Sequence, residues 1–312
     1  MKWLIYGHKG WIGSMFLRHI ELDTNDTIIT TNSRCDNATD IENDIITHTP
    51  DRIICCIGRT HGEGCNSIDY LIGKLPINMR DNLVAPLIIA QLGNKYGIHV
   101  TYIGTGCIYN YPIDNVECGA FNTNVEFTEE SPVNFFGSDY SIVKGQTDKL
   151  IRLYDNVLNA RIRMPITNDL HSNRNFITKI LGYQKVHDVP NSATYLPEMI
   201  PIILSFARNG ITGTYNMVNP GVTSPKMVKD AFGMDYELVN ESDLFKNGNV
   251  LEKRSNNKLN IDKLTNKLKE LDLPYYISNI NDVISHIKNP CKNILPNKLD
   301  ELGSGIVGLN FK

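Results

Sequence analysis

The sequence of 312 residues predicts an α/β fold in which helices cover both faces of a doubly wound parallel sheet. Two observations lead to this prediction. Apolar runs rich in β-favouring residues alternate with helical segments through the first half of the chain, and such alternation is typical of βαβ units. The first apolar run also passes directly into a glycine-rich turn and then into a helix, over residues 3–20. Because βαβ units place helices on both faces, we expect the strands to be buried.

The elements predicted for the first half follow one another in a regular order. Four strands are expected at Trp3–Tyr6, Thr27–Thr31, Arg52–Ile57 and His99–Ile103. Helices are expected at Ile12–Ile20, Ile41–His48, Pro76–Tyr96 and Ser138–Tyr154, and the last helix leads to a fifth strand at Leu158–Ile162. Gly97 follows the third helix, where a glycine commonly ends a helix, so we expect it to be the C-cap.

The rhythm of the chain changes after Pro165. From there to about residue 245 the sequence mixes short helical segments with Pro- and Asn-rich turns, and it contains one clear strand, Thr214–Met217. Residues 290–312 carry little pattern. We therefore expect a core formed by residues 1–165, and a smaller region, residues 166–312, that is interleaved with the last elements of the core.

The composition argues against several classes of protein. A formal net charge of −3 gives no reason to expect nucleic acid or an anionic membrane as a partner. The seven cysteines are odd in number and lack the spacing of metal ligands, which favours a reducing, cytoplasmic setting and no metal site. No stretch approaches the ~18 uninterrupted apolar residues of a membrane span.

The glycines of the first turn predict a dinucleotide-binding loop. They form a GxxGxxG pattern between the first strand and the first helix. At this place a dinucleotide pyrophosphate meets free backbone N–H groups and the positive end of the helix. The residues expected to bind the cofactor here are Gly7, His8, Lys9, Gly10, Trp11, Ile12 and Gly13. The spacing resembles that of the extended short-chain dehydrogenases.

The end of the second strand bears on the choice between NADP(H) and NAD(H). An acidic residue at this place would accept hydrogen bonds from a ribose 2′-hydroxyl. This chain instead has Ser33 and Arg34, which are expected to face His8 and Lys9 of the glycine loop. A guanidinium suits a 2′-phosphate, so the sequence favours NADP(H). Asp36 lies close enough to leave NAD(H) possible.

A YxxxK pattern supplies a candidate proton donor. Tyr140 and Lys144 share one face of the fourth predicted helix. An ammonium group beside a phenol favours the phenolate, so we expect Lys144 to lower the pKa of Tyr140 towards neutrality, as suits a proton donor to a carbonyl that receives hydride. Tyr70 and Lys74 repeat the pattern, but Gly73 lies between them, so we favour Tyr140.

Thr105 and Cys107 follow each other at the end of the fourth strand. Residues two apart in an extended chain point the same way, so we expect the hydroxyl and the thiol to face one cavity. Thr105 would then hydrogen-bond a substrate carbonyl beside Tyr140, and Cys107 is a candidate for proton transfer at a carbon next to that carbonyl. A small buried apolar role for Cys107 is the alternative.

Eight segments together resemble one family. They are LIYGHKGWIG, TGCIY, YSIVK, RIRMPITNDL, RNFITKI, VPNSATYLPE, YNMVNPGV and RSNN, and the likeness extends from about residue 2 to about residue 265. The sequence resembles the bifunctional nucleotide-rhamnose synthase/epimerase-reductases. These are related to the dTDP-4-dehydrorhamnose reductases of the extended short-chain dehydrogenase/reductase superfamily.

The resemblance implies a fold and a reaction. Residues 1–165 would be an NADP-binding Rossmann core, and residues 166–312 would mainly bind the nucleotide sugar. The family epimerises a nucleotide-4-keto-6-deoxyglucose at C3 and C5 and then reduces it at C4 with NADPH, which gives the nucleotide-β-L-rhamnose. The plant-like segments favour a UDP-linked over a dTDP-linked substrate, and the habit of the superfamily implies a homodimer.

The resemblance also assigns roles to residues. The reductase set falls on Thr105, Tyr140 and Lys144, and the epimerase pair falls on Cys107 and Lys179. Inversion at a carbon beside a carbonyl needs one group to take a proton and another to return it on the opposite face. An exposed helix cation is the alternative for Lys179. The remaining matches are Pro165 along the nicotinamide, Thr60 in the sugar pocket, and Asn175 and Arg254 at the sugar and the diphosphate.

Two other functions stay open from the sequence. One is a reductase alone, acting on a substrate that a separate enzyme has epimerised, and Cys107 and Lys179 discriminate it from the epimerase-reductase. The other is a non-catalytic, cofactor-binding regulatory subunit. The intact set of Thr105, Tyr140 and Lys144 counts against this second alternative.

Overall fold

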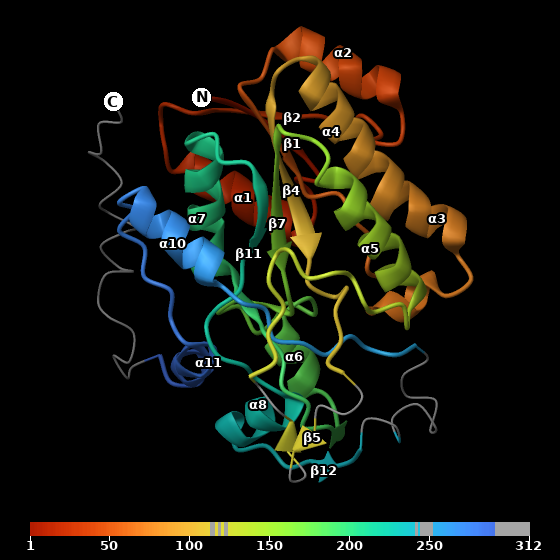
Figure 1. Ribbon diagram of the computed structural model, residues 1–312, viewed down its shortest axis with the longest axis vertical. Helices are drawn as coiled ribbons and strands as arrows, with labels where there is room; N and C mark the ends of the chain where they lie inside the picture. Colours follow the sequence, from red (N-terminus) through yellow and green to blue (C-terminus); the bar gives the residue numbers. More distant parts are fainter. Residues whose placement is uncertain (113–115, 118–119, 122–123, 241–242, 244–251, 291–312) are drawn as a thin grey trace.

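Six parallel strands form the central sheet of the computed structural model, which describes residues 1–112, 116–117, 120–121, 124–240, 243 and 252–290. Across the sheet the strands are β11 (Gly213–Asn216), β7 (Val157–Ile162), β4 (His99–Thr105), β3 (Arg52–Cys55), β1 (Lys2–Tyr6) and β2 (Thr27–Thr30). The direction of chain progression reverses between β1 and β3, and parallel sheets bind ligands at the carboxyl ends beside such a switch point. The predicted Rossmann-type, doubly wound α/β fold is confirmed (Figure 1).

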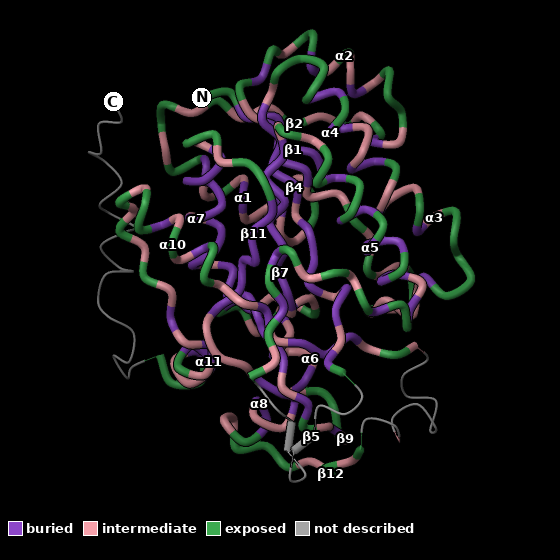
Figure 2. The backbone as a smooth tube through the Cα atoms, viewed as in Figure 1, coloured by how far each residue is buried: buried purple, intermediate pink, exposed green. Residues whose placement is uncertain are grey.

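Two layers of helices enclose the sheet. Helices α1 (Trp11–Glu21), α7 (Leu196–Arg208) and α10 (Asp262–Glu270) pack on one face, and α2 (Ala38–His48), α4 (Ala85–Lys95) and α5 (Asp139–Ile151) pack on the other (Figure 1). Side chains of β1 alternate between the layers, since Trp3 and Ile5 join the first apolar core and Leu4 and Tyr6 join the second. All four are buried, so the strand reads as an unbroken apolar run (Figure 2).

Local signals in the sequence set the ends of several helices. The Ser138 hydroxyl accepts a hydrogen bond from Ser141 N (3.1 Å) and so caps α5. The Asn37 side chain caps α2 in the same way. Gly97 has a φ of +67° just beyond α4, which is the left-handed conformation expected of a residue that ends a helix.

A π-helical turn interrupts the long helix expected over residues 76–96. The structure has α3 (Leu75–Met79), the π turn at Arg80–Val84 and α4 in direct succession. Inside the turn, the buried Asn82 side chain accepts a hydrogen bond from Arg59 N (2.8 Å) and donates one to Arg59 O (3.0 Å). Through Asn82, the π turn thus holds the segment that follows β3 in place. This tertiary contact cannot be recognised from helical periodicity in the sequence.

The second half of the chain divides between the sheet and a smaller apolar core. Helices α7 and α10 and strand β11 return to the sheet. The smaller core joins α6 (Phe176–Leu181), α8 (Pro225–Phe232), α11 (Ile280–Lys288), β8 (Pro165–Ile166) and β10 (Thr194–Tyr195). The remaining short elements are η1 (Ile68–Leu71), β5 (Val116–Glu117), β6 (Ala120–Phe121), β9 (Lys185–Val186) and β12 (Glu237–Leu238). In Figure 1, α6 and α8 lie below the sheet, in the direction of the β4 arrow.

Helix α7 contradicts the expectation of only short helices after Pro165. It has 13 residues and is buried along most of its length. Its two prolines had indicated turns, but Pro197 occupies the first turn, where the missing N–H removes no helical hydrogen bond. Pro201 lies inside the helix, where apolar packing on the sheet outweighs its low helix propensity. Neither α7 nor any other helix in the described ranges is long and apolar enough to cross a membrane.

Candidate active site

The glycine-rich turn lies at the carboxyl end of β1, beside the switch point of the sheet. Gly7 has a φ of +83°, and a Cβ atom on it would lie 2.9 Å from the carbonyl carbon of Cys56. A Cβ on Gly13 would lie 2.1 Å from Gly7 O, so only glycine allows the helix to pack this closely. Gly10 caps α1 without a side-chain hydrogen bond, which leaves N–H groups at the helix end for a phosphate. Around the glycines, Lys9 is exposed and His8, Trp11 and Ile12 are half-buried.

The loop after β2 meets the glycine loop, as expected. Lys9 Nζ donates a hydrogen bond to Asn32 Oδ1 (2.7 Å), and Asn32 is followed by Ser33 and Arg34. The Arg34 guanidinium makes two hydrogen bonds to Asp36, Nε to Oδ1 (3.0 Å) and Nη2 to Oδ2 (3.1 Å). Since Arg34 is largely exposed, this ion pair adds little stability, and a 2′-phosphate can compete for the guanidinium.

Thr105, Cys107, Tyr140 and Lys144 come together between the end of β4 and the first turns of α5. The Cys107 backbone N–H donates to Thr105 Oγ1 (3.1 Å), and the Thr105 side chain is also hydrogen-bonded with Tyr140. Tyr140 and Lys144 are 7% and 4% exposed. The strand-end and helix residues selected from the sequence therefore share one buried cluster, which we call the catalytic cluster.

The electrostatics of the catalytic cluster differ from the expectation. Burial, and then the charge of Cys107, raises the pKa of Tyr140, while the hydrogen bond with Thr105 lowers it. Lys144 donates a hydrogen bond to the Tyr102 hydroxyl, and burial lowers the pKa of Lys144 to about 8. The expected net lowering of the Tyr140 pKa is therefore wrong, because desolvation of a buried phenol outweighs the other effects. Tyr140 is protonated at neutral pH.

Lys179 lies in a second cluster, on α6. Its Nζ atom donates a hydrogen bond to Asn66 O (3.1 Å), and the residue is half-buried. Burial, together with the charges of Arg174 and Arg254, lowers the pKa of Lys179. The side chain is therefore not a fully exposed surface cation. A lysine that releases its proton more readily is suited to proton transfer.

Three arginines, Arg59, Arg174 and Arg254, lie around Lys179 and His61, and we call these five residues the cationic cluster. Arg254 pairs with Asp69 (2.6 Å) and Arg59 pairs with Asp81, whereas Arg174 has no carboxylate partner among the residues that the structure describes. The Nη1 atoms of Arg174 and Arg254 are both buried, and neither has a hydrogen-bond partner among the described residues. These two guanidinium groups retain donors that an anionic ligand can use.

His61 shows how positive this region is. Burial, and then the charges of Arg174 and Arg59, lowers the pKa of His61 to about 4. A concentration of positive charge of this kind attracts an anionic ligand. Sequence analysis selected Arg254 and missed Arg174, although Arg174 stands in the RNFITKI segment. No local pattern shows that it folds against residues as distant as Arg254.

Arg163, which follows β7, is a second residue that sequence analysis missed. It is only 2% exposed. Its Nη1 atom donates to Cys107 Sγ (3.3 Å) and to Ser255 Oγ (3.1 Å), and its Nη2 atom donates to Ser255 O and to Asn191 Oδ1. The next residue, Met164, has a φ of +39°. Such a conformation is strained for a long side chain, and strain of this kind is concentrated at functional sites.

The catalytic and cationic clusters meet along residues 254–255. Arg254 reaches Asp69 in the cationic cluster. Its neighbour Ser255 accepts the hydrogen bond from Arg163 and donates one to Tyr109 O (2.6 Å), next to the catalytic cluster. Arg254 and Ser255 thus connect the catalytic cluster, which contains Cys107, to the cationic cluster, which contains Lys179.

Three softer predictions have different outcomes. Thr60 is exposed, and Pro165 is half-buried at the start of β8. Asn175 is fully buried, with Oδ1 accepting from Ile177 N (3.2 Å) as the N-cap of α6 and Nδ2 donating to Thr167 O (2.8 Å). The amide of Asn175 therefore caps the helix that carries Lys179, and its contact with the sugar stays a prediction.

The second YxxxK pair forms a contact of its own. Lys74 Nζ lies 3.6 Å from the centroid of the Tyr70 ring, which is a cation–π contact. The same ring covers Gly62, where a Cβ atom would lie 2.1 Å from it. Tyr70 therefore packs on a loop, and the choice of Tyr140 as the proton donor stays a prediction.

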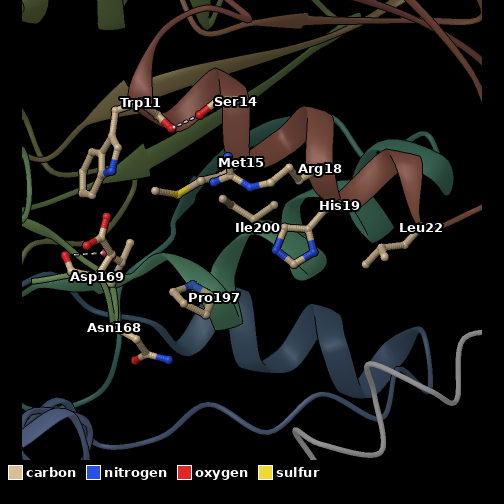
Figure 3. Close-up of a pocket in the computed structure, with 11 residues that line it drawn as sticks. Trp11, Ser14, Met15, Arg18, His19, Leu22, Asn168, Asp169, Pro197 and Ile200 are labelled. Atoms are coloured by element: carbon tan, nitrogen blue, oxygen red, sulfur yellow. Dashed lines mark hydrogen bonds between the residues drawn. The ribbon is translucent and has the colours of Figure 1, made fainter. Parts of the chain in front are cut away.

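A cavity of about 490 Å³ lies between α1, α7 and residues 167–169. Figure 3 shows Trp11 and Ser14 at one end of it and Leu22 at the other. Trp11 is the single member of the predicted site among the lining residues. The cavity is therefore separate from the catalytic and cationic clusters. Across the described ranges, no three His, Cys, Asp or Glu side chains gather as metal ligands would.

Comparison with known proteins identifies relatives of the chain. An uncharacterized protein of Acanthamoeba polyphaga mimivirus is 43% identical over 298 residues, which cover 92% of this chain and 99% of that protein. The bifunctional dTDP-4-dehydrorhamnose 3,5-epimerase/dTDP-4-dehydrorhamnose reductase of Arabidopsis thaliana is 34% identical over 277 residues, which cover 86% and 88%. No family model matches the chain.

A solved structure agrees with these relatives. The crystal structure of a UDP-rhamnose synthase from Acanthamoeba polyphaga mimivirus aligns with a TM-score of 0.81 at 41% identity, covering 92% of this chain and 98% of that chain. Sequence and fold therefore point to one group of proteins. The chain belongs to the nucleotide-rhamnose synthase family of bifunctional 3,5-epimerase/4-reductases.

Proposed function

We propose that the protein converts UDP-4-keto-6-deoxy-D-glucose into UDP-β-L-rhamnose, by 3,5-epimerisation followed by NADPH-dependent reduction of the 4-keto group. The observation that carries this proposal is the contact of Cys107 with Thr105, which is in turn bonded with Tyr140. A base for a carbon acid and a proton donor for the adjacent carbonyl oxygen thus occupy one buried cluster. Membership in the epimerase/reductase family supports the same two steps.

Epimerisation needs two groups that move protons at carbons beside the carbonyl. We assign Cys107 as the group that takes the proton from C3 or C5, and Lys179 as the group that returns a proton on the opposite face. The lowered pKa of Lys179, caused by burial and neighbouring cations, suits it to regain its proton from solvent and give it up again. The Thr105 hydroxyl donates to the carbonyl oxygen, where the enolate charge develops.

Reduction needs a proton at the carbonyl oxygen and a hydride at C4, and bound NADPH supplies the hydride. The glycine turn fits such a cofactor, because Gly7 leaves no room for a Cβ atom and α1 has no side-chain cap. Tyr140, whose pKa burial raises, is protonated at neutral pH and gives its proton to the oxygen. Lys144 is cationic below about pH 8 and stabilises the phenolate that remains.

The nucleotide sugar is assigned mainly to residues 166–312, and NADPH to residues 1–165. Arg174 and Arg254 suit the diphosphate, because a guanidinium pairs two oxygens at once and each side chain keeps a buried Nη1 atom that no other described residue engages. The preference for UDP over dTDP rests on the likeness to the mimivirus UDP-rhamnose synthase.

A reductase that acts on an already epimerised substrate is the second candidate. Such an enzyme needs Thr105, Tyr140 and Lys144, and it has no use for Cys107. The hydrogen bond from the buried Arg163 to Cys107 Sγ (3.3 Å) favours the bifunctional enzyme, because it ties a charged group to the sulfur.

The proposed function is tested by incubating the protein with UDP-4-keto-6-deoxy-D-glucose and NADPH in heavy water and identifying the product by NMR. We expect UDP-L-rhamnose with deuterium at C3 and C5. The Tyr140→Phe variant should exchange both positions without oxidising NADPH, because its phenol is gone and Cys107 is intact. An unexchanged 6-deoxy-D-sugar would leave a simple reductase and contradict the proposal.

We further propose a homodimer formed through α5 and the π turn, which pack side by side (Figure 1). Val84, Ile142 and Leu150 expose apolar side chains on these two elements, and Met79 exposes one at the end of α3, just before the π turn. Exposed apolar residues that gather on one surface mark an interaction site. Light scattering after size-exclusion chromatography should give a dimer for the native protein and a monomer for Leu150→Glu. A native monomer would contradict the assignment.

A further inference from the structure

Two arginines are buried in the described part of the chain, Arg161 and Arg163. A guanidinium removed from water is costly unless an anion or a full set of acceptors offsets the lost hydration. Arg161 has its anion in Asp148, at 2.7 Å. For Arg163, no carboxylate within the described ranges forms an ion pair, and its Nε atom is buried without a hydrogen-bond partner there. Its charge needs a different counterion.

The neighbours of the Arg163 guanidinium are mostly neutral. Ser255 accepts through its hydroxyl and its carbonyl oxygen, and Asn191 accepts through its side-chain oxygen. The remaining contact is Cys107 Sγ, at 3.3 Å from Nη1. Of the groups that touch the guanidinium, the thiol is the one that can become an anion near neutral pH. The phenol of Tyr111 is also near, but burial raises the pKa of Tyr111 to about 12, so that phenol stays neutral.

We propose that Arg163 is a positioning residue that holds Cys107 as a thiolate aimed into the catalytic cluster. The inference rests on the proposed function, because a thiolate is the form of Cys107 that can take a proton from C3 or C5. Arg163 itself touches neither substrate nor cofactor in this assignment. Its part is to supply the charge and the hydrogen bond that fix the sulfur.

The proton transfers balance with this assignment. The thiolate takes the C–H proton and becomes a thiol, while the electron pair of the broken C–H bond moves into the enolate. The Lys179 ammonium then gives a proton to the same carbon on the opposite face and becomes an amine. Exchange with solvent returns Cys107 to the thiolate and Lys179 to the ammonium, and no oxidant or reductant is needed.

Among the described residues, the titratable groups that interact with the Cys107 sulfur are Arg163 after β7 and Tyr140 and Lys144 on α5. Burial lowers the pKa of Arg163, and the charge of Cys107 opposes that effect. The charge of Cys107 also adds to burial in raising the pKa of Tyr140. A thiolate at Cys107 therefore keeps the reductase phenol protonated during epimerisation.

The test measures the reactivity of Cys107 in the full-length protein without substrate. Iodoacetamide is added at a series of pH values, and the alkylated peptides are quantified by mass spectrometry. Arg163→Met should lower the alkylation rate of Cys107 at pH 7 by about tenfold or more, since only the thiolate is alkylated. Arg163→Lys, which keeps a positive charge, should recover part of the rate. Cys65, which contacts Ser67 instead, is the internal control and should react equally in all three proteins.

Equal rates for Cys107 in the native and Arg163→Met proteins would overturn the proposal. Circular dichroism shows whether each variant folds. If Arg163→Met does not fold, Arg163→Gln, which keeps hydrogen-bond donors without the charge, takes its place, and an unchanged alkylation rate of Cys107 at pH 7 would also overturn the proposal. No substrate enters the assay, so failure here is distinct from a failure to make UDP-rhamnose.

Discussion

Arg161 and Arg163 stand two residues apart where β7 ends, and both are buried, yet their surroundings differ. Arg161 makes two hydrogen bonds to Asp148, Nε to Oδ1 (2.8 Å) and Nη2 to Oδ2 (2.7 Å). Burial alone would lower the pKa of Arg161, but the hydrogen bond and charge of Asp148 raise it. For Arg163 burial prevails and lowers the pKa, while the thiol of Cys107 provides the opposing charge.

We infer from this difference that the Arg161–Asp148 ion pair stabilises the fold, whereas the Arg163–Cys107 hydrogen bond serves the reaction. The carboxylate of Asp148 accepts two hydrogen bonds from the Arg161 guanidinium, so this pair joins α5 to β7. In the proposed mechanism Cys107 takes a proton from the substrate, so its contact with Arg163 serves the reaction rather than the stability of the fold. The two pairs can be broken separately, which makes the comparison testable.

The largest effect should follow from breaking the structural pair. Asp148→Ala leaves Arg161 buried without its anion, so the free energy of unfolding should fall by about 3–5 kcal/mol. Urea unfolding followed by circular dichroism measures the change. Asp155→Ala, which alters an exposed carboxylate shortly after the same helix, should change stability by less than about 0.5 kcal/mol. Similar losses in the two variants would remove the contrast.

Breaking the functional pair should stop one reaction and spare the fold. Cys107→Ser keeps a small polar group but no thiolate, so deuterium exchange at C3 and C5 should fall by about 10²–10⁴-fold. Stability should fall by only about 1 kcal/mol, because the serine hydroxyl can accept the hydrogen bond that Arg163 donates to Cys107 Sγ. Reduction of UDP-4-keto-L-rhamnose, which is already epimerised, provides the control and should persist. Loss of both activities would show that Cys107 serves the whole site.

A pH profile should sharpen the division between the two reactions. Burial lowers the pKa of Lys144 to about 8, so its ammonium group is present below that pH and lost above it. The rate of reduction should therefore decline above about pH 8, by up to tenfold per pH unit. Lys144→Arg keeps its charge to much higher pH, so its profile should stay flat across this range. A native profile that is flat to pH 10 would contradict the role of Lys144.

The smallest effect is expected at the far end of the cofactor site. Arg34 is largely exposed and already paired with Asp36, so Arg34→Ala should weaken the preference for NADPH over NADH by about fivefold or less, the usual worth of an exposed ion pair. Steady-state reduction with each cofactor measures the ratio. An unchanged ratio would contradict the role of Arg34 and would indicate that Lys9 or another cation discriminates NADPH from NADH.

Features that depend on neighbouring residues were predictable from the sequence. The glycine turn lies in one strand-to-helix connection, and Tyr140 and Lys144 lie four residues apart on α5, so local spacing determines their geometry. The order of strands and helices followed from the same local periodicity. Helix α7 was missed because its prolines act locally as breakers, whereas packing on the sheet decides its conformation.

Features that depend on distant residues were not predictable in this way. Arg163 contacts Cys107, Asn191 and Ser255, which approach one another only after the chain has folded. The raised pKa of Tyr140 was also missed, because burial decides it and burial is a property of the fold. Asn175 was assigned to the sugar through its motif, but its amide caps α6. Of the segment 290–312, residues 291–312 lie outside the described residues, so their weak pattern remains an observation on sequence alone.

The most direct test of this division uses Arg163→Met and follows both reactions in one protein. Deuterium exchange into UDP-4-keto-6-deoxy-D-glucose reports the thiolate, and NADPH-dependent reduction of UDP-4-keto-L-rhamnose reports Tyr140 and Lys144. We predict that exchange falls by about tenfold or more while reduction stays within about threefold of the native rate, because Arg163 acts through Cys107. If the two rates fall together, or if exchange is unchanged, Arg163 is a structural residue like Arg161 and the separation of the two pairs is wrong.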